Sequence, residues 1–450
     1  MASRSLSERT DAETIVIFGF GRKKGNQNVE EEEEEQEFVL FQGALNGQDA
    51  DLAANARLAE AGLVPAKQLV SDALARRAET VRLEPKGKVA VSTFFVDGIP
   101  YPGVRMPAQA ALAVTQMLKL LAGLDVRERS KPQSGGIRAE FAETPYELRV
   151  DSVPLKTGGE RLTVRARNTK IRLETPDDLG FSAALKSTIR DTAGNKEGLM
   201  LAAGPPGSGV TTTAIAIVRG IDAYVFSIVC LADLQGRDLP HVNFPDDAAT
   251  DSLEQRIARA KRAEADVLFV DPIKSGETAK TLLNDSDDAT IVAEMPAADA
   301  AEAITRLVAA TKDPNLVAER LKLVLSQKLV RLLCPKCKHA YRPNPKLLAK
   351  VGLPPETNVL YRPPSNNDEE AEEEVCSKCG GIGYFGRTGL IEAVQVSDAV
   401  KQIILKGADA KAIRVQARKE SMQTFQSDGL RLVAEGATSL EELQRAFKNG

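Results

Sequence analysis

Apolar and polar residues in the first third of the chain follow first a helical and then a mixed pattern. Between residues 49 and 77, apolar side chains recur every three or four positions, the spacing of a helix with one buried face. We interpret residues 46–77 as a helical linker segment. Residues 78–170 combine strand and helix periods and are predicted to form an α+β unit. Its expected elements are strands at 89–96, 146–150 and 162–165 and a helix at 107–124.

Residues 179–330 alternate short apolar runs with helical stretches, which is typical of a parallel sheet covered by helices. This pattern predicts an α/β fold for the central part of the chain. The expected strands are 199–203, 224–229, 267–270 and 290–293. Residues 331–395 carry two pairs of cysteines, and residues 396–450 return to a helical pattern.

The first 45 residues differ from the rest in composition. Six consecutive glutamates, Glu30–Glu35, repel one another and cannot bury apolar surface, so we expect residues 1–45 to form a flexible acidic tail. The same segment holds a glycine cluster at Gly19–Gly25. No βαβ unit with a downstream acid follows this cluster, which favours an ordinary loop over a dinucleotide-binding loop.

Composition narrows the class of protein. The 450 residues are enough for two to four domains, and 59 Lys+Arg against 63 Asp+Glu give a net charge of −4. Nucleic-acid-binding domains usually carry a basic excess, so no nucleic-acid partner is expected. No apolar stretch reaches 18 residues, and the N-terminus lacks the apolar core of a signal peptide. We therefore expect a cytoplasmic protein without a membrane span.

The first candidate for chemistry is a glycine-rich segment between an expected strand and an expected helix. Gly204-Pro-Pro-Gly-Ser-Gly-Val-Thr211 contains every element of the phosphate-binding loop G-x-x-x-x-G-K-[ST] except the lysine, whose position is Val210. Losing that charged hydrogen bond costs about 1.5–3 kcal/mol, or about 10–150-fold in affinity. A tight strand-to-helix turn without a ligand is the alternative. The residues expected to contact a nucleotide are Gly204, Pro205, Pro206, Gly207, Ser208, Gly209, Val210, Thr211 and Thr212.

A second candidate lies at the end of the predicted strand 267–270. Asp271 follows this apolar run, which is the position of a magnesium-binding carboxylate in a phosphate-transfer site. Strand-terminal acids are also common structural caps, so both roles stay open. Cys230 is isolated at the end of another apolar run, and we interpret it as a buried apolar residue rather than a reactive thiol.

The other four cysteines form two C-x-x-C pairs, Cys334 with Cys337 and Cys376 with Cys379. Four thiolates at this spacing are typical of a closed, structural Zn²⁺ site, and four reduced, unligated thiols are the alternative. The insert between the pairs contains the acidic run 368–374, which we expect to be a solvated loop. The sequence thus predicts a tetracysteine zinc module at residues 331–395.

Three further segments carry a resemblance to a known family. Residues 124–135 (LDVRERSKPQSG), 327–338 (QKLVRLLCPKCK) and 380–392 (GGIGYFGRTGLIE) are similar, in this order, to motifs of the secretion ATPase superfamily. This superfamily comprises the motor proteins of type II secretion and type IV pilus assembly, and the similarity runs from Glu79 to Leu443. It implies a RecA-like P-loop core, an α+β, PAS-like N-terminal motor subdomain and a zinc-binding C-terminal lobe.

The same resemblance implies ligands, partners and a location. Proteins of this family bind ATP or ADP with Mg²⁺ and form hexamers. They work with inner-membrane platform proteins, which places this chain in the cytoplasm at the inner face of the cytoplasmic membrane. Arg149, Arg161 and Arg165 lie in the region where the family supplies arginines to the nucleotide, although solvated strand residues are the alternative.

The chain departs from the family at four places that carry chemistry. The lysine is Val210, the acidic box falls on residues 229–231, the expected catalytic glutamate is Pro272, and two histidines fall on Ala289 and Pro296. We therefore expect a motor homologue that binds nucleotide weakly and is deficient in hydrolysis, acting as a subunit or regulator of a type II secretion or type IV pilus-like assembly machine. It would form a homo-hexamer or a mixed oligomer with an active motor paralogue. The alternatives are an active ATPase and a nucleotide-independent, zinc-stapled scaffold at the membrane platform.

Overall fold

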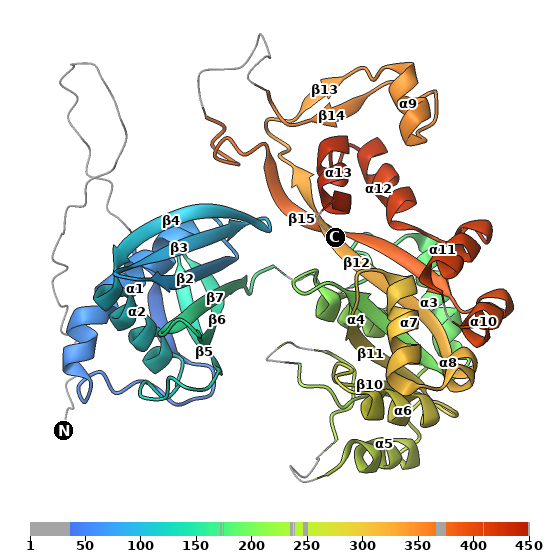
Figure 1. Ribbon diagram of the computed structural model, residues 1–450, viewed down its shortest axis with the longest axis horizontal. Helices are drawn as coiled ribbons and strands as arrows, with labels where there is room; N and C mark the ends of the chain where they lie inside the picture. The colour runs from blue at the N-terminus through green and yellow to red at the C-terminus, as the bar shows by residue number, and fades with distance from the viewer. Residues whose placement is uncertain are drawn as a thin grey trace, which may run out of the picture.

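The computed structural model describes residues 37–171, 173, 175–234, 237, 239–245, 251–365, 375–407 and 409–448. It has two parts, an N-terminal unit built on one sheet and a larger C-terminal unit built on another (Figure 1). The glycine cluster and glutamate run of the predicted tail, and the acidic run 368–374, lie outside the described residues. No helix within the described ranges is long and apolar enough to cross a bilayer.

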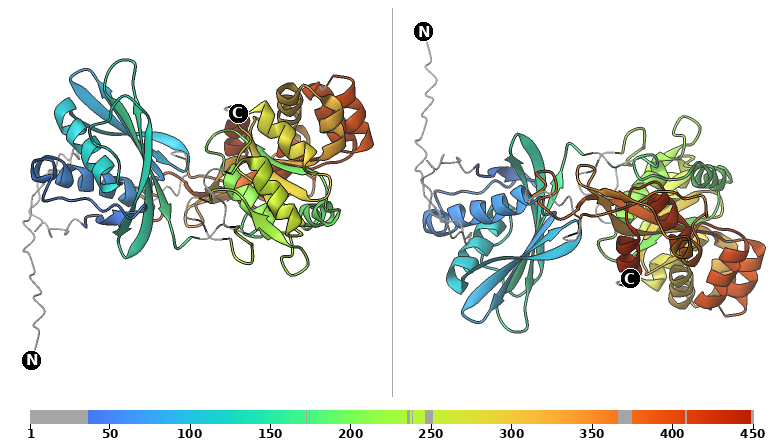
Figure 2. Two further views of the ribbon diagram at one scale, coloured as in Figure 1. Left: turned by 90° about the horizontal axis from the view of Figure 1, so that it is seen from below. Right: turned by 90° about the horizontal axis from the view of Figure 1, so that it is seen from above.

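The N-terminal unit is a seven-stranded antiparallel sheet with two helices on one face (Figure 2). Apolar residues at alternate positions, as in the predicted strand 89–96, point one face of the sheet toward the helices. The strand order is β1-β5-β6-β7-β2-β3-β4. The elements are β1 (Leu40–Ala44), α1 (Ala56–Ala75), β2 (Thr80–Lys86), β3 (Val89–Val96), β4 (Ile99–Pro107), α2 (Ala108–Leu121), β5 (Gln133–Phe141), β6 (Thr144–Pro154) and β7 (Glu160–Asn168).

Two segments that the sequence placed outside this unit lie within it. β1, at the end of the predicted tail, pairs with β5 at the edge of the sheet. α1, which covers most of the predicted linker 46–77, packs into the core of the unit. Val39, Leu69 and Val70 are buried there. A helix with a continuous apolar face is stabilised mainly by packing, which explains why α1 joins the nearest core.

A buried ion pair connects α2 to the sheet. The Lys119 side chain is 0% exposed, and its Nζ donates to Glu160 Oε1 of β7 at 2.8 Å and to the Glu128 carbonyl at 2.6 Å. Ser152 Oγ donates to the same carboxylate oxygen at 2.7 Å. A buried charge without a partner is strongly destabilising, so this network fixes the helix against β6 and β7.

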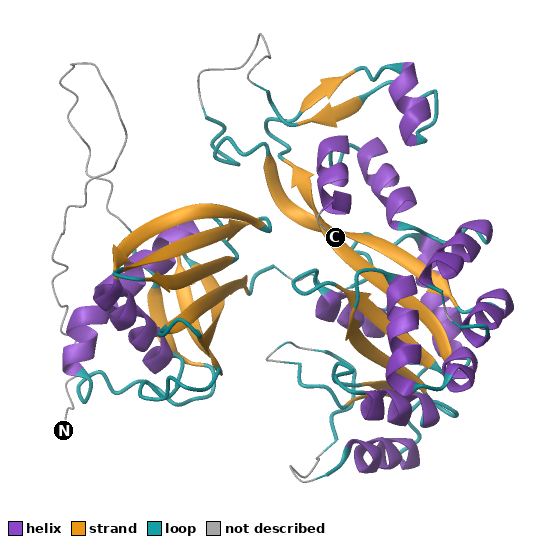
Figure 3. Cartoon of the chain, in the orientation of Figure 1, coloured by secondary structure: helices purple, strands orange, loops and turns teal. Residues whose placement is uncertain are grey.

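The C-terminal unit has the α/β layers that the alternating pattern predicts. Figure 3 shows the strands of this unit in orange, with helices in purple around them. Five strands run parallel and β15 lies antiparallel at one edge, in the order β15-β12-β8-β11-β10-β9. The strands are β8 (Leu199–Gly204), β9 (Ile228–Cys230), β10 (Val267–Phe269), β11 (Thr290–Pro296), β12 (Leu321–Leu333) and β15 (Tyr384–Gln395).

Helices cover both faces of this sheet. One face packs against α3 (Ala183–Gly194) and α4 (Val210–Arg219). The other packs against α5 (Leu253–Arg262), α6 (Gly276–Asn284), α7 (Ala300–Thr311), α8 (Pro314–Arg320), α10 (Asp398–Leu405) and α11 (Ala410–Lys419). The apolar strands are buried on both sides, as their nearly continuous apolar sequences indicate.

The predicted strand 224–229 is wrong over its first four residues. Tyr224 and Val225 are 89% and 66% exposed, and β9 begins only at Ile228. The Asp222 side chain accepts a hydrogen bond from the Tyr224 N–H at 2.9 Å and holds this segment in a turn. The apolar run therefore combines an exposed turn with a short edge strand.

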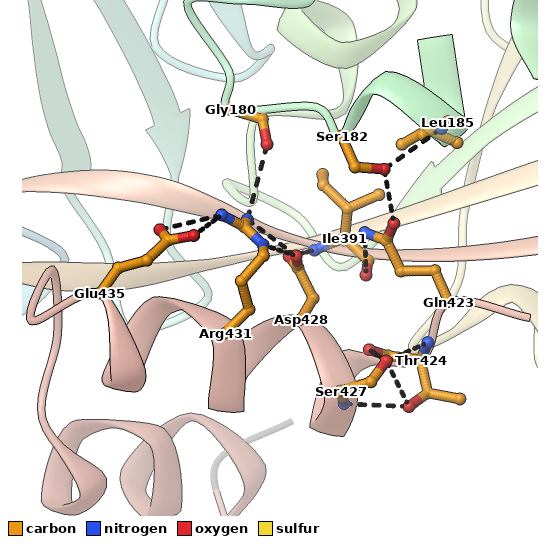
Figure 4. A network of polar contacts seen from close by, with 10 residues as sticks. All are labelled: Gly180, Ser182, Leu185, Ile391, Gln423, Thr424, Ser427, Asp428, Arg431 and Glu435. Carbon is orange, nitrogen blue, oxygen red and sulfur yellow. Dashed lines mark hydrogen bonds and ion pairs between the residues drawn. The ribbon is translucent and has the colours of Figure 1, made fainter. Parts of the chain in front are cut away.

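The C-terminal lobe is built on the antiparallel pair of β12 and β15. Around its far end lie β13 (His339–Tyr341), α9 (Pro345–Val351), β14 (Leu360–Arg362), α12 (Phe425–Ala434) and α13 (Leu440–Lys448), which share a separate core. Figure 4 shows how α12 is attached: Asp428 accepts from the Ile391 N–H of β15 at 2.9 Å, and Arg431 donates to Asp428 at 2.8 Å. Arg431 also reaches the Gly180 carbonyl ahead of α3, at 3.5 Å.

Candidate functional site

The predicted phosphate-binding loop connects β8 to α4. Gly207 and Gly209 have φ angles of 80° and 84°, a left-handed conformation that favours glycine. A Cβ atom at Gly204 would lie 2.7 Å from the Gln327 carbonyl oxygen, so the strand end also requires glycine. The side-chain amide of Gln327, on β12, donates to the Ser208 carbonyl at 2.7 Å. The neighbouring strand therefore holds the loop in one conformation.

A cavity of about 640 Å³ opens in front of this loop, a volume that suits a small-molecule ligand. It lies between the two units, because β6 and β7 of the N-terminal unit line it together with the loop. All nine loop residues predicted from the sequence line the cavity except Ser208, whose Oγ is buried without a hydrogen-bond partner in the described part of the chain.

Four arginines contribute positive charge to the cavity. Arg149, Arg165 and Arg167 extend from β6 and β7, and Arg237 comes from the segment after β9. Arg165 and Arg167 each form an ion pair with an acid of β6. The remaining predicted arginine, Arg161, pairs with a glutamate of β2 and does not line the cavity.

Val210 occupies the lysine position of the loop. It is the first residue of α4 and presents an apolar side chain to the cavity. The N–H groups at a helix N-terminus carry partial positive charge and can bind an anion. Residues 204–212 include no Lys or Arg, so any further charge must come from other elements.

An acid that no sequence motif indicated also lines the cavity. Glu294 lies on β11, is 7% exposed, and its Oε2 accepts a hydrogen bond from Thr211 Oγ1 at 2.8 Å. Burial raises the pKa of the Glu294 carboxyl group, and the charge of Asp271 adds to the rise, whereas the Thr211 hydrogen bond and Arg237 oppose it. The signal available in the sequence was a single acid within the apolar run of the predicted strand 290–293 and its continuation.

The two other single-residue predictions lie at the same edge of the sheet. Asp271 follows β10, and its Oδ1 accepts from the Asp233 N–H at 3.0 Å, so it at least anchors the segment after β9. The next residue, Pro272, lines the cavity. Cys230 is buried on β9, and burial raises the pKa of its thiol to about 11, as expected for an unreactive core cysteine.

The four paired cysteines come together beside the antiparallel strands β12 and β15. The Sγ atoms of Cys334 and Cys376 are 4.0 Å apart, those of Cys337 and Cys379 are 3.6 Å apart, and all four lie within 4.8 Å of one another. A tetrahedral Zn²⁺ ion with Zn–S bonds of about 2.3 Å places its sulfur atoms about 3.8 Å apart. The cluster therefore has the size that a tetrahedral metal ion requires.

Backbone N–H groups favour the metal-binding thiolate form of Cys376, whereas burial raises the pKa of Cys337. The Gly383 N–H donates to Cys379 Sγ at 3.3 Å. The backbone N–H of Cys379 makes the largest contribution to lowering the pKa of Cys376 to about 6. The thiolate is the form that binds metals, and four sulfur ligands without an open position are typical of a structural site.

The cysteine module also contacts the N-terminal unit. The Gly386 N–H donates to Asp97 Oδ1 at 3.1 Å, and Arg387 Nη2 lies 3.5 Å from Glu79 Oε1. Asp97 lies in the turn between β3 and β4. These contacts therefore join the module to the sheet that carries three of the cavity's arginines.

Comparison with known proteins adds relatives and structural neighbours. A family model described as "Type II/IV secretion system protein" matches residues 60–445. The type II secretion system protein E of Pseudomonas aeruginosa is 30% identical over 387 residues, covering 84% of this chain and 74% of that protein. The type IV pilus assembly ATPase PilB of Thermus thermophilus is 29% identical over 386 residues, covering 84% of this chain.

The chain is shorter than several of these relatives. It spans 42% of the length of the Thermus thermophilus PilB and 66% of that of the Myxococcus xanthus PilB. Among solved structures, the ATPase DotB of Legionella pneumophila aligns with a TM-score of 0.52 and 13% identity, covering 86% of this chain and 96% of that chain. At this identity the likeness supports the fold alone.

Proposed function

The chain belongs to the family of type II/IV secretion system proteins, and from this premise we propose that it is a motor homologue that binds nucleotide weakly and is deficient in hydrolysis. It would act as a subunit or regulator of a type II secretion or type IV pilus-like assembly machine. One observation carries this proposal: the cavity keeps the loop backbone of a P-loop, but Val210 and Pro272 replace the lysine and the expected catalytic glutamate.

Nucleotide binding is supported by groups that still face the cavity. The glycines let backbone N–H groups converge at the start of α4, and Arg149 and Arg165 face the loop. Thr211, which lines the cavity, and Asp271, which does not, are the residues whose sequence positions suit Mg²⁺ binding, and a bound ion would neutralise phosphate charge. Arg161 would reach a nucleotide only after leaving its pair with Glu84.

Deficient hydrolysis is supported by the side chains that line the cavity. Pro272 and Pro296 have no group that can transfer a proton, and Ala289 is fully buried in the core. Two carboxylates line the cavity within the described residues, and both are engaged: Glu294 by the loop and Glu147 by an arginine. Acid–base catalysis contributes about 10²–10⁴-fold to a rate and one charge-stabilising group about 10²–10³-fold, so losing both should lower turnover to background.

Binding and turnover of the purified chain test the proposal. We expect saturable binding of fluorescent mant-ADP with Mg²⁺, and ATP hydrolysis indistinguishable from heat-denatured protein. Val210→Lys should leave hydrolysis at background, because Pro272 remains in place of the glutamate. Steady multiple turnover by the unmodified chain would contradict the proposal and favour an active ATPase. An empty titration with ADP and ATP would favour the nucleotide-independent scaffold.

Metal binding and assembly complete the proposal. The four cysteines would hold Zn²⁺, and the N-terminal sheet unit would correspond to the PAS-like motor subdomain of the family. The chain would form a homo-hexamer or a mixed oligomer with an active motor paralogue, and would work with inner-membrane platform proteins at the inner face of the cytoplasmic membrane. Light scattering of the chain alone and mixed with a motor paralogue tests the assembly: a monomer under both conditions would contradict it.

A further inference from the structure

We infer that Arg237 supplies the phosphate-binding charge that the loop lacks at Val210. The inference rests on the proposed nucleotide site, and it names the residue by which this chain would bind the terminal phosphates of a nucleoside di- or triphosphate. Arg237 lies outside the loop motif and outside the strands that carry the other arginines, so the sequence pattern did not indicate this role.

The first support is the position of Arg237. Its side chain lines the same cavity as loop residues 204–212 and Glu294. The residue is half-buried, and its Nη1 atom is fully enclosed without a hydrogen-bond partner among the described residues. An enclosed charged donor without an acceptor costs free energy, and such groups in native proteins call for an explanation. A bound phosphate would supply the missing acceptor.

The second support is the contrast with the other arginines of the cavity. Arg165 and Arg167 already form ion pairs with acids of β6, and Arg149 also has a partner. Arg237 forms no ion pair with any described residue. A guanidinium can bind a phosphate through two parallel hydrogen bonds, so one arginine can take over the role of one lysine.

The third support is the charge around Arg237. Burial lowers the pKa of Arg237, and the positive charges of Arg167 and Arg149 act in the same direction, while Glu294 and Glu147 oppose them. Arginine nevertheless stays protonated in proteins, so the group keeps its charge. An anion in the cavity would both pair the guanidinium and reduce the repulsion among the arginines.

A double-mutant cycle at positions 210 and 237 tests the inference, read by mant-ADP affinity in excess Mg²⁺. Arg237→Gln should weaken binding by about 10–150-fold, the range for one charged hydrogen bond. In the unmodified chain, Val210→Lys should change the ADP affinity by less than about threefold. In the Arg237→Gln background, the same change should raise the ADP affinity by at least about tenfold. Arg76→Gln, which removes an exposed arginine that pairs with Asp72 and does not line the cavity, is the matched control and should change affinity less than about twofold.

Competition with pyrophosphate and with adenosine locates the contact. Arg237→Gln should weaken the binding of pyrophosphate by the same factor as the binding of ADP. It should leave the binding of adenosine unchanged. Equal ADP affinity of the unmodified chain and Arg237→Gln would overturn the inference while the nucleotide site stands. No binding by the unmodified chain, with binding gained by Val210→Lys, would overturn the inference and the proposed binding together. ATP turnover by the unmodified chain would contradict only the proposed hydrolysis deficiency.

A second variant separates phosphate binding from folding. Arg237→Lys keeps the charge and loses the planar fork, so it should bind ADP with an affinity between those of the unmodified chain and Arg237→Gln. If both variants melt at a lower temperature but bind ADP as the unmodified chain does, Arg237 is only structural and the inference fails.

Discussion

The loop cavity and the cysteine module both depend on β12, yet they differ in what they have kept. Gln327 on β12 fixes the phosphate-binding loop, and Cys334 directly follows the same strand. In the module, every ligand that the motif specifies is present and the four sulfur atoms come together. In the cavity, the loop has the backbone conformation of a phosphate-binding loop, but Val210 stands where the motif has its lysine and Pro272 where the resemblance places a glutamate. The scaffold of a site and its chemistry can therefore change separately.

The difference follows from what each site contributes to stability. A structural metal supplies folding free energy, so losing one thiolate costs the protein its fold locally. A loop lysine acts on the ligand and contributes little to the folded state, so its replacement by valine leaves the loop intact. Glycine conformation and the hydrogen bond from Gln327 are enough to keep the backbone in place.

Loss of a cysteine ligand should have the largest effect of the variants considered, on both metal content and local folding. A small effect would contradict the contrast drawn between the two sites. Cys379→Ser should release the metal and expose residues 331–395 to trypsin, because structural zinc sites supply about 10–16 kcal/mol of apparent binding free energy in small domains. Elemental analysis and limited proteolysis measure both. Cys230→Ala, outside the cluster, should keep one metal per chain. A fully loaded Cys379→Ser chain with unchanged proteolysis would contradict the structural role.

Breaking the buried ion pair between α2 and β7 tests how strongly this pair stabilises the N-terminal sheet, which carries three of the cavity's arginines. Lys119→Met leaves the buried Glu160 carboxylate without its cation, so the free energy of unfolding should fall by about 3–5 kcal/mol. Urea denaturation followed by circular dichroism measures this loss. Lys401→Met, at an exposed pair with Asp398, is the control and should cost less than about 1 kcal/mol. Similar losses for both variants would mean that the Lys119 pair is not a special anchor.

The smallest expected effect concerns Glu294, which places a negative charge beside the loop. Glu294→Gln should tighten ADP binding in Mg²⁺-free buffer by about three- to tenfold, because two unit charges a few ångströms apart interact by about 1 kcal/mol even in water. Omitting Mg²⁺ removes the ion that could bridge the carboxylate and the phosphates, and omitting a chelator leaves the cysteine cluster undisturbed. Glu319→Gln, an exposed acid on α8, should leave the affinity unchanged.

The pH dependence of ADP affinity is a second test of the role of Glu294. The pKa of Glu294 is raised above its ordinary value of 4.5, so its carboxyl group takes up a proton at a higher pH than an exposed glutamate does. As the pH falls toward this raised pKa, the protonated fraction of Glu294 grows and its repulsion of phosphate declines. The affinity of the unmodified chain should therefore rise relative to Glu294→Gln at the same pH. Parallel pH profiles for the two proteins would show that Glu294 does not act on the ligand.

Short sequence patterns predicted the strands, turns and loops whose conformation depends on neighbouring residues in the chain. The alternation of residues 89–96 matches β3, and Asp97-Gly98 forms the predicted turn, with both residues at positive φ. The C-x-x-C pairs bring their ligands close because each pair is fixed by its own short turn. The glycine spacing of residues 204–209 predicted the loop conformation for the same reason.

Features that depend on distant pairing could not be found in this way. Glu294 and Arg237 meet in one cavity because β11 lies beside β8 and the segment after β9 reaches the same edge of the sheet. The sequence gives no strand order, so neither residue could be placed beside the loop. Apolar composition alone also misled the strand assignment at Tyr224, whose side chain lies in solvent.

The hydrogen bond between Gly386 and Asp97 connects the metal content of the cysteine module to the geometry of the cavity. The module that holds the cysteines is an anchor for the sheet whose other strands carry Arg149 and Arg165. With Zn²⁺ in the proposed site, a zinc-starved cell would hold chains in which that anchor is released and the spacing between the two sides of the cavity is no longer fixed. Nucleotide affinity in such cells would then report on trace-metal availability.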